Sequence, residues 1–342
     1  MPLLSAVGIS GLQAGEDVNM SPELMGSGAL STTRSSLPSL FVSRPAAGDR
    51  VRDFFTSRIR NPHTRRAYLE AVRQFSAFCT EIGLQDLAEV QPVHVAAFVE
   101  AQLRTHSRPT VKQHLAALRM LFDWMVVGQV IPTNPAHAVR GPKHTQKRGR
   151  TPVLASEEAR ALLDTIAADS LPGLRDRALI GLMVYSFARV GAAVSMRVED
   201  YFIQGRRGWV RLHEKGGKEH TMPAHHNLEH YLDEYISAAG IAQDRKGPLF
   251  RTTRGRTREL TDNPMTQPDV WRMIRRRAGA AGIRTEIGCH TFRATGITAY
   301  LKNGGRLEIA QQMANHESAR TTGLYDRRDD DVSLDEVERI LI

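Results

Sequence analysis

Residues 290–325 read HTFRATGITAYLKNGGRLEIAQQMANHESARTTGLY, and this stretch decides how the second half of the chain is interpreted. Arg293 follows His290 by three residues, and Tyr325 follows His316 by nine. A phenol has a pKa near ~10 and is mostly protonated at neutral pH, so a tyrosine nucleophile needs cationic and hydrogen-bonding neighbours. The two histidines and the arginine are neighbours of that kind. The pattern therefore indicates a tyrosine prepared for attack.

The composition favours a polyanionic partner. A chain of 342 residues suits two domains of ordinary size, and its net charge of +9 gives a pI near 9.9. Basic surfaces gain affinity for nucleic acids by releasing counterions from phosphates. On charge alone, the alternative is a basic protein without such a partner. Together with the tyrosine pattern, the charge leads to the hypothesis that Tyr325 attacks a phosphodiester in DNA.

The positions of the cysteines and the lengths of the apolar runs indicate in which cellular compartment the protein is expected. Cys79 and Cys289 lie far apart and form no metal-binding pattern, which favours a reducing environment over a disulfide framework. The first residues lack a basic segment and carry Glu16 and Asp17, which is atypical of a secretory signal. No apolar run approaches the ~20 residues that span a bilayer. We expect a cytoplasmic, nucleoid-associated protein with no membrane partner.

The first half predicts an all-α domain at 44–135, preceded by an arm at 1–43 that is rich in small residues and expected to be flexible. Apolar residues recur at spacings of three and four, as in amphipathic helices. Asn61-Pro62 is expected to end the first helix, and Thr64 to cap the second. The expected helices cover 49–59, 64–83, 94–105 and 108–129.

Polar and basic residues gather near the starts of the second and fourth helices, where backbone N–H groups suit phosphates. The candidates for DNA contact there are Thr64, Arg65, Arg66, Thr110, Lys112 and His114. A solvated polar face is the alternative. Residues 136–152 contain Pro, Gly and several cations but no acid, which is typical of a linker. Its candidates for DNA contact are Lys143, Lys147 and Arg148.

The second domain is predicted at 153–332. Ser156 is expected to cap its first helix, and a long apolar helix at 174–196 contains one unexpected charge, Arg189. A buried arginine needs a partner, and Asp200 and Glu199 are nearby in sequence. Residues 209–223 predict a β-hairpin with a Gly-Gly turn.

The hairpin is expected to carry Lys215 and Lys218 at its tip. A helix is expected within 223–240, and its histidines His225, His226 and His230 lack the spacing of a zinc site. Phosphate-facing arginines are expected in a basic loop at 251–258 and in a helix after Pro268, with a solvated face as the alternative. Those arginines are Arg254, Arg256, Arg275 and Arg276. A short amphipathic helix is expected at 333–342.

Six residues in order resemble the signature of the tyrosine recombinases, the phage integrase family, over roughly residues 50–342. They are Arg189, Lys215, His290, Arg293, His316 and Tyr325. Each alone would more often be structural, but the joint order is specific. The resemblance implies a mainly α, multidomain fold. It joins an all-α, four-helix, SAM-like core-binding domain to a mixed α/β catalytic domain with a small antiparallel sheet, and the two form a C-shaped clamp around double-stranded DNA.

The resemblance also implies a reaction. Tyr325 would form a 3′-phosphotyrosyl bond and release a 5′-hydroxyl, and another strand would then attack through a Holliday junction. The two arginines and His316 would bind phosphate oxygens, and His290 would accept the phenol proton or hold the phosphate. Lys215 would act as general acid, with Lys218 as the competing candidate. Further implications are a homotetramer on inverted-repeat sites, the possible help of DNA-bending proteins, a tail helix docking in cis or in trans, and no metal or ATP.

Three departures from the family pattern accompany these matches. Ala192 stands where a glutamate often follows the first arginine, Ala294 replaces a histidine, and Asn315 replaces a glycine. Something other than residue 192 must then hold Arg189. Two alternatives are a type IB topoisomerase and a non-catalytic DNA-binding clamp. The pattern leaves open whether the outcome is integration, excision, resolution or inversion, and what the target sequence is.

Overall fold

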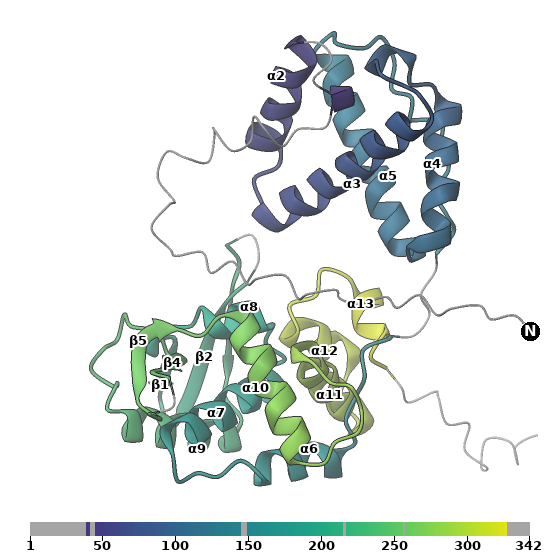
Figure 1. Ribbon diagram of the computed structural model, residues 1–342. Coiled ribbons are helices and arrows are strands. Elements are labelled where there is room, and N and C mark those ends of the chain that lie inside the picture. The colour runs from purple at the N-terminus through teal and green to yellow at the C-terminus, as the bar shows by residue number, and fades with distance from the viewer. Residues whose placement is uncertain (1–38, 42–44, 145–148, 215–216, 256, 327–342) are drawn as a thin grey trace, which may run out of the picture. The chain divides into compact units, whose positions relative to one another are not determined.

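The computed structural model describes residues 39–41, 45–144, 149–214, 217–255 and 257–326 (Figure 1). The chain divides between Thr145 and Gln146 into two compact units. Several predicted features lie outside the described residues: Lys147, Arg148, Lys215, Arg256 and the tail helix at 333–342.

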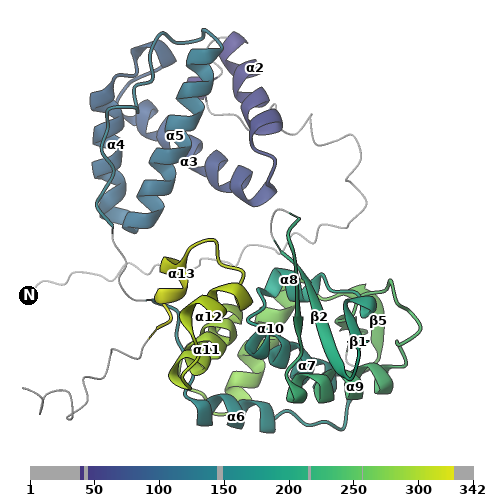
Figure 2. The same cartoon turned by 180° about the vertical axis from the view of Figure 1, so that it is seen from behind.

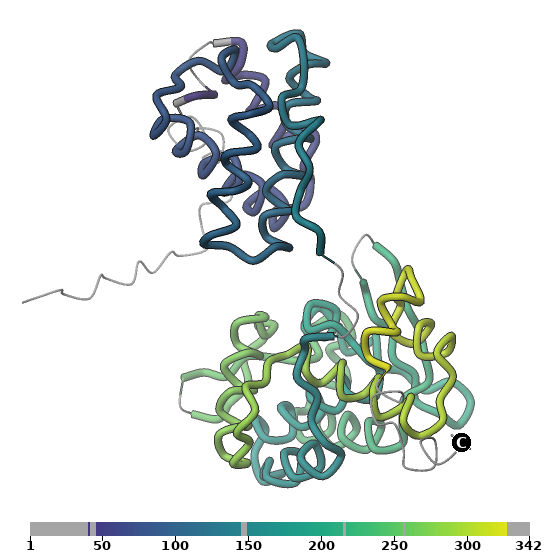
Figure 3. Tube along the Cα trace, turned by 90° about the vertical axis from the view of Figure 1, so that its right-hand side faces the viewer, coloured from purple at the N-terminus to yellow at the C-terminus, as the bar shows by residue number. Residues whose placement is uncertain are grey.

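The regular elements described in the first unit are all helices (Figure 3), and they pack around one apolar core. Its elements are η1 (Ser39–Phe41), α2 (Pro45–Asp53), the π-helical turn η2 (Phe54–Arg58), α3 (Pro62–Glu81), η3 (Leu87–Glu89), α4 (Pro92–Thr105) and α5 (Arg108–Val127). Helix α3 presents its apolar stripe to α5, and the ring of Phe75 lies edge-on to those of Phe98 and Phe122. Aromatic pairs of this geometry add to the free energy gained by burial alone.

Two details of the first unit correct the sequence predictions. Asn61, expected to end a helix, instead caps α3, because its side chain accepts from the N–H groups of His63 and Thr64. Leu40 and Phe41, assigned to a flexible arm, are buried in the helical core, where Phe41 contacts the ring of Phe122. Their apolar surface is large enough to hold this end of the arm in place.

The second unit is mixed α/β and contains two small antiparallel sheets (Figure 2). Its helices are α6 (Ser156–Asp164), α7 (Leu171–Tyr185), α8 (Val190–Val194), η4 (Val198–Asp200), α9 (His226–Ala239), α10 (Gln267–Ala280), α11 (Cys289–Lys302), α12 (Leu307–Met313) and α13 (Ala319–Gly323). Its strands are β1 (Tyr201–Gln204), β2 (Arg207–His213), β3 (Glu219–Pro223), β4 (Arg251–Thr253) and β5 (Leu260–Pro264). Helix α7 is central, packing against both α9 and α11.

The predicted hairpin is present as β2 and β3, and β1 adds a third strand in the order β1-β2-β3. Val210 and Leu212 point into the core while their neighbours are more exposed, which is the alternation expected of a half-buried strand. The basic loop at 251–258 was predicted without regular structure, and this was wrong at its start. Residues Arg251–Thr253 form β4, and Arg251 is buried beside the carboxylates of Asp244 and Asp262.

The predicted helix at 174–196 is broken into α7 and α8. The break includes Phe187, whose φ of 53° is left-handed and interrupts a helix. The Phe187 carbonyl is turned away from the helical hydrogen-bond ladder and accepts from the buried guanidinium of Arg293. Periodicity did not reveal this break, because the segment is apolar on every side. The first helix of the unit also differs: Ala155, and not Ser156, occupies the cap position of α6.

Helices α7 and α11 approach each other closely at Gly296. A Cβ atom there would collide with the Val184 carbonyl oxygen and lie 2.9 Å from the Phe187 ring. The contact fixes α11 against the turn that leads to α8. A glycine is required because backbone, which has little freedom to move, occupies the space.

We predict that Gly296→Val lowers the free energy of unfolding by roughly 1–3 kcal/mol, because the added methyl groups force α11 away from α7. The thermal unfolding midpoint of the full chain measures this. Gly279→Ala in α10 is the control, since nothing lies within 4 Å of a Cβ there and alanine favours helix. Equal midpoints for Gly296→Val and the unsubstituted protein would contradict the close contact.

Candidate active site

The structure brings together residues from three separate parts of the second unit. Arg189 lies at the start of α8, His290 and Arg293 lie on α11, and His316 and Tyr325 flank α13. Helices α11, α12 and α13 are adjacent in both views (Figures 1 and 2). Five of the six predicted residues therefore meet, and the sixth, Lys215, lies outside the described residues.

Tyr325 is held at both ends. Its hydroxyl lies 2.8 Å from Nε2 of His290, and its carbonyl accepts from the Thr298 hydroxyl at 3.1 Å. The phenol ring stacks on the His316 imidazole, with centroids 5.9 Å apart and planes 10° from parallel. The residue is 8% exposed. This geometry limits the number of positions that the hydroxyl can adopt.

His316 is oriented by a residue that sequence reasoning missed. Its Nδ1 lies 2.9 Å from the hydroxyl of Thr322, which is fully buried in α13. If the hydroxyl accepts from Nδ1, the other ring nitrogen is an acceptor in the neutral form. The preceding Asn315 has a φ of 46°, which explains why this position suits glycine and why asparagine, which tolerates that conformation, can replace it.

Arg293 is the most buried charge of the site, at 1% exposure. Its two terminal nitrogens donate to the carbonyls of Phe187 and Ala314, and Nε has no hydrogen-bond partner among the described residues. Burial, followed by the charge of Arg189, lowers the pKa of Arg293 to about 10. The guanidinium therefore remains charged at neutral pH.

Arg189 has a partner other than those predicted. Its Nη1 donates to Oε2 of Glu214 at 2.7 Å, and the Glu214 side chain is 4% exposed. The suggested partners Asp200 and Glu199 were wrong, because they pair with residues of the sheet and its approach. Glu214 thus supplies the carboxylate that Ala192 lacks. Sequence reasoning missed it because the two residues are far apart along the chain.

Burial and positive charge together determine the protonation of the site. Burial, then Arg293 and Arg189, lowers the pKa of His290, and the same causes lower that of His316 to about 3. Burial raises the pKa of Tyr325, and the two arginines partly offset this rise. Near neutral pH, both imidazoles are therefore neutral and the phenol is protonated. A neutral His290 at 2.8 Å can accept the phenol proton.

The depressed pKa of His316 predicts a pH dependence of stability. In the unfolded chain this imidazole takes up a proton near pH ~6.5, whereas in the folded chain it resists protonation down to about 3. Its contribution to stability is therefore complete above pH ~6.5 and is lost as the pH falls toward 3.

The variant His316→Gln should lose less of its thermal midpoint than the unsubstituted protein when the pH is lowered from about 7 to about 4. Calorimetry of the full chain at several pH values gives both slopes. The comparison rests on the slopes because the variant can differ in absolute stability for other reasons. Identical slopes would show that His316 is protonated as easily when folded as when unfolded.

The predicted DNA contacts of the first unit are only partly at the surface. Arg66, Lys112 and Lys143 are exposed, and Thr64 and Thr110 are half-buried. Arg65 is half-buried and donates to the Ile59 carbonyl. His114 was predicted wrongly as a surface contact: it is 5% exposed, lies 3.1 Å from the Gln102 amide oxygen, and burial lowers its pKa. The stripe of α5 places its side chain inside the helical core.

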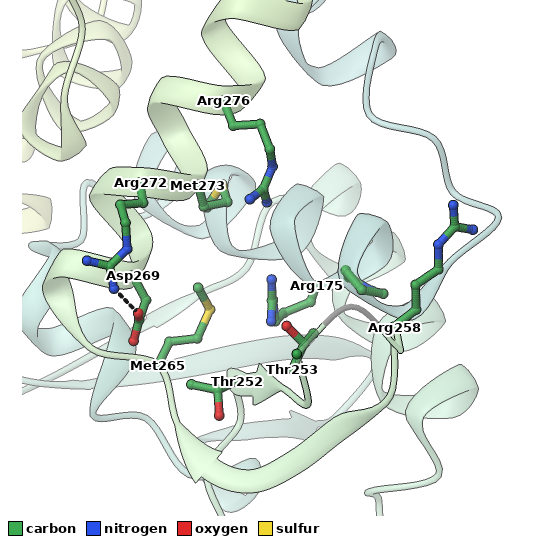
Figure 4. A pocket seen from close by; sticks show the side chains of 11 residues that line it. Arg175, Thr252, Thr253, Arg258, Met265, Asp269, Arg272, Met273 and Arg276 are labelled. Carbon is green, nitrogen blue, oxygen red and sulfur yellow. Dashed lines mark hydrogen bonds and ion pairs between the residues drawn. The ribbon is translucent and has the colours of Figure 1, made fainter. Parts of the chain in front are cut away.

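The second unit carries a basic cavity of about 510 Å³ between α10, the start of α7 and the β4–β5 hairpin (Figure 4). Its cationic lining consists of Arg175, Arg258, Arg272 and Arg276. Arg272 pairs with Asp269, and the exposed Arg276 lies 3.4 Å from the buried Asp176. Of the residues predicted here, Arg275 lies 3.6 Å from Glu286, and Arg254 is exposed. Sequence reasoning missed Arg258 and Arg272, although both belong to the same basic segments.

Neither a metal centre nor a membrane span is found among the described residues. No group of three or more His, Cys, Asp or Glu side chains there could hold a metal ion. His225 caps α9 through Nδ1, and its ring stacks on Tyr185. None of the described helices is long and apolar enough to cross a membrane.

Sequence comparison identifies the family to which this chain belongs. The sequence model of the phage integrase family matches residues 152–331, and that of the phage integrase N-terminal SAM-like domain matches residues 51–127. The chain belongs to the phage integrase family, the tyrosine recombinases. It is a site-specific recombinase that breaks and rejoins DNA strands, as the ordered residues predicted. The topoisomerase and non-catalytic alternatives are not favoured.

Curated relatives agree with this assignment. The chain is 30% identical over 288 residues to tyrosine recombinase XerC of Pelobacter propionicus, covering 83% of this chain and 90% of that one. It is 28% identical over 270 residues to tyrosine recombinase XerC of Thermodesulfovibrio yellowstonii, covering 77% and 85%.

In structure, the chain resembles the XerH site-specific recombinase bound to a palindromic difH substrate, with a TM-score of 0.66, 17% identity and 91% and 92% coverage. It also resembles a lambda integrase dimer bound to a COC′ core site, with a TM-score of 0.64, 20% identity and 83% and 96% coverage. The predicted fold class, a helical SAM-like domain joined to a mixed α/β catalytic domain, is confirmed.

Proposed function

We propose that Tyr325 is the nucleophile of this recombinase and that His290 is its base. The supporting observation is the 2.8 Å contact between the phenol hydroxyl and a neutral imidazole nitrogen. Attack on the scissile phosphate forms the bond from the tyrosine oxygen to phosphorus and breaks the bond from phosphorus to the 5′-oxygen. The phosphodiester energy is kept in the 3′-phosphotyrosyl link, so the step requires no ATP.

The arginines and His316 are proposed to stabilise the transition state. A pentacovalent phosphorus carries added negative charge on its nonbridging oxygens, and planar guanidinium groups match those oxygens with paired donors. Arg189 is partly exposed, and no described residue hydrogen-bonds to Nε of Arg293. His316 has one nitrogen directed at Thr322 and donates from the other when Thr322 supplies its hydroxyl proton to Nδ1. Preorganised donors of this kind are worth on the order of 10²–10³ in rate each.

Lys215 is proposed as the general acid that protonates the leaving 5′-oxygen. It directly follows Glu214, whose side chain reaches the site. The competing residue Lys218 pairs with Glu317 at 3.0 Å, which favours Lys215 for the role. An alkoxide is a poor leaving group in water, so a positioned ammonium accelerates the step.

The wider reaction is also proposed from the family. A 5′-hydroxyl of a second strand would attack the phosphotyrosyl bond and produce a Holliday junction within a homotetramer on inverted-repeat sites. A lambda integrase tetramer bound to a Holliday junction has a similar fold, with a TM-score of 0.60 and 20% identity. The outcome would be integration, excision, resolution or inversion, for example of a mobile element, with accessory DNA-bending proteins as further partners. The protein would act on DNA in the cytoplasm, associated with the nucleoid.

The domains are proposed to divide these tasks. Residues 44–135 would bind the core of the site, 136–152 would follow the duplex as a basic linker, and 153–332 would carry the chemistry. The tail at 333–342 would dock on a neighbouring protomer, and the arm at 1–43 has no assigned role. The two units would close around the duplex as a clamp.

The variant Tyr325→Phe should abolish the covalent DNA–protein adduct, because it removes the attacking oxygen while keeping the ring that stacks on His316. The substrate is a nicked duplex carrying the recombination site, which inverted repeats in the flanking genomic DNA would identify. Denaturing electrophoresis detects the adduct, and a mobility shift confirms that binding is retained. An adduct that persists in Tyr325→Phe would contradict the assignment of the nucleophile.

The basic cavity between α10, the start of α7 and the β4–β5 hairpin is proposed to bind backbone phosphates. Arg276→Ala should weaken DNA binding several-fold and reduce the slope of log affinity against log salt by about 1, because one phosphate contact is lost. Asp176 would keep its bonds from Arg175 and Arg277, so the fold should be retained. The exposed Arg160 on α6 gives the control variant, Arg160→Ala. Fluorescence anisotropy at several salt concentrations measures both quantities, and a slope equal to that of the control would exclude Arg276 as a phosphate contact.

A further inference from the structure

Glu214 is a buried carboxylate beside the proposed phosphate site. It directly follows His213, the last residue of β2. Its backbone N–H donates to the Lys218 carbonyl at 2.8 Å, so the hairpin fixes its position. Its side chain is 4% exposed and reaches Nη1 of Arg189 at 2.7 Å. A negative charge this close to a bound phosphate would repel it, unless that charge is neutralised by its pairing with Arg189. The burial of this carboxylate therefore requires an explanation.

The geometry of Arg189 provides that explanation. The side chain is 40% exposed and is attached at the very start of the short helix α8, where little packing limits its rotamers. A guanidinium has five N–H donors, so one can bind Glu214 while others remain for a phosphate. A fixed carboxylate on one edge of the fork orients the remaining donors. Without it, the arginine would have to be ordered when DNA binds.

The surrounding space shows that the carboxylate comes from the hairpin and not from α8. A cavity of about 530 Å³ is lined by Arg189, Ala192, Glu214 and His290, among others. Ala192 lies one helical turn beyond Arg189 and contributes only a methyl group to this cavity. A longer acidic side chain at 192 would project into the same space. We infer that Glu214 is a positioning residue that holds Arg189 in the orientation required by the scissile phosphate. This inference rests on the proposed function.

The first test replaces the charge and keeps the shape. Glu214→Gln should slow single-turnover adduct formation on saturating DNA by about 10- to 100-fold, because the arginine donor is less well placed. The DNA dissociation constant should change much less, since Arg189 is one of many phosphate contacts. Glu219→Gln is the matched control, because Glu219 is an exposed carboxylate on the same hairpin. A rate for Glu214→Gln equal to that of the control would overturn the inference.

A second substrate separates Arg189 from Lys215. A duplex whose bridging 5′-oxygen is replaced by sulfur has a leaving group that needs no proton, because a thiol is far more acidic than an alcohol. This substrate should restore cleavage by Lys215→Ala and leave Glu214→Gln slow. Restored cleavage by Glu214→Gln would show that Glu214 acts on the general acid, and the inference would fail.

A third variant moves the carboxylate that pairs with Arg189 from the hairpin to α8. Glu214→Gly combined with Ala192→Glu places a carboxylate on α8 in the cavity shared with Arg189. Cleavage should be at least 10-fold faster in this double variant than in Glu214→Gly alone, which a purely structural role of Glu214 would not produce. Thermal unfolding of each variant shows that the compared proteins are folded. A folded double variant no faster than Glu214→Gly would count against the inference. If the unsubstituted protein itself forms no adduct, the proposed function fails instead.

Discussion

The site depends on the hydrogen bonds that the buried Arg293 guanidinium donates to two backbone carbonyls. The guanidinium joins α11 to the turn between α7 and α8 through the Phe187 carbonyl, and to the end of α12 through the Ala314 carbonyl. Arg189 lies two residues beyond the first contact, and His316 lies two residues beyond the second. One charged side chain thus sets the spacing of three segments that carry the proposed chemistry. A charge so deeply buried is expensive unless it is fully hydrogen-bonded.

The site is consequently short of negative charge. Glu214 pairs with Arg189, and within the described part of the chain Nε of Arg293 has no hydrogen-bond partner. The same excess of positive charge, together with burial, keeps both histidines neutral. A phosphate would supply the missing anion, and its developing charge would gain from donors that are already in place. The electrostatics therefore favour a phosphoryl transition state and also make a neutral histidine available as base.

Much of this arrangement follows from the sequence, because local spacing determines it. His290 and Arg293 are three apart, so one helix places both on the same side. The hairpin, the capped helices and the apolar stripes are likewise short-range patterns. The order of the six residues predicted the family before any spatial relation was known.

The remaining features depend on contacts between distant residues. The Arg189–Glu214 pair spans 25 residues, and the break between α7 and α8 arises from a carbonyl that bonds to a side chain 106 residues away. The Thr322 hydroxyl looks like any polar helix residue until His316 is placed beside it. The burial of His114 depends on the rotation of α5 within its bundle. No local pattern encodes such relations, because the packing of whole elements determines them.

The central claim is that this folded site directs the Tyr325 oxygen at a DNA phosphate. The most direct test is to isolate the covalent complex, digest it with trypsin and nuclease, and locate the attached nucleotide by mass spectrometry. Cleavage after Arg320 and Arg327 yields the peptide TTGLYDR, in which Tyr325 is the one tyrosine. We expect a 3′-phosphonucleotide on that peptide. A nucleotide attached to any other residue, or through its 5′-phosphate, would contradict the account.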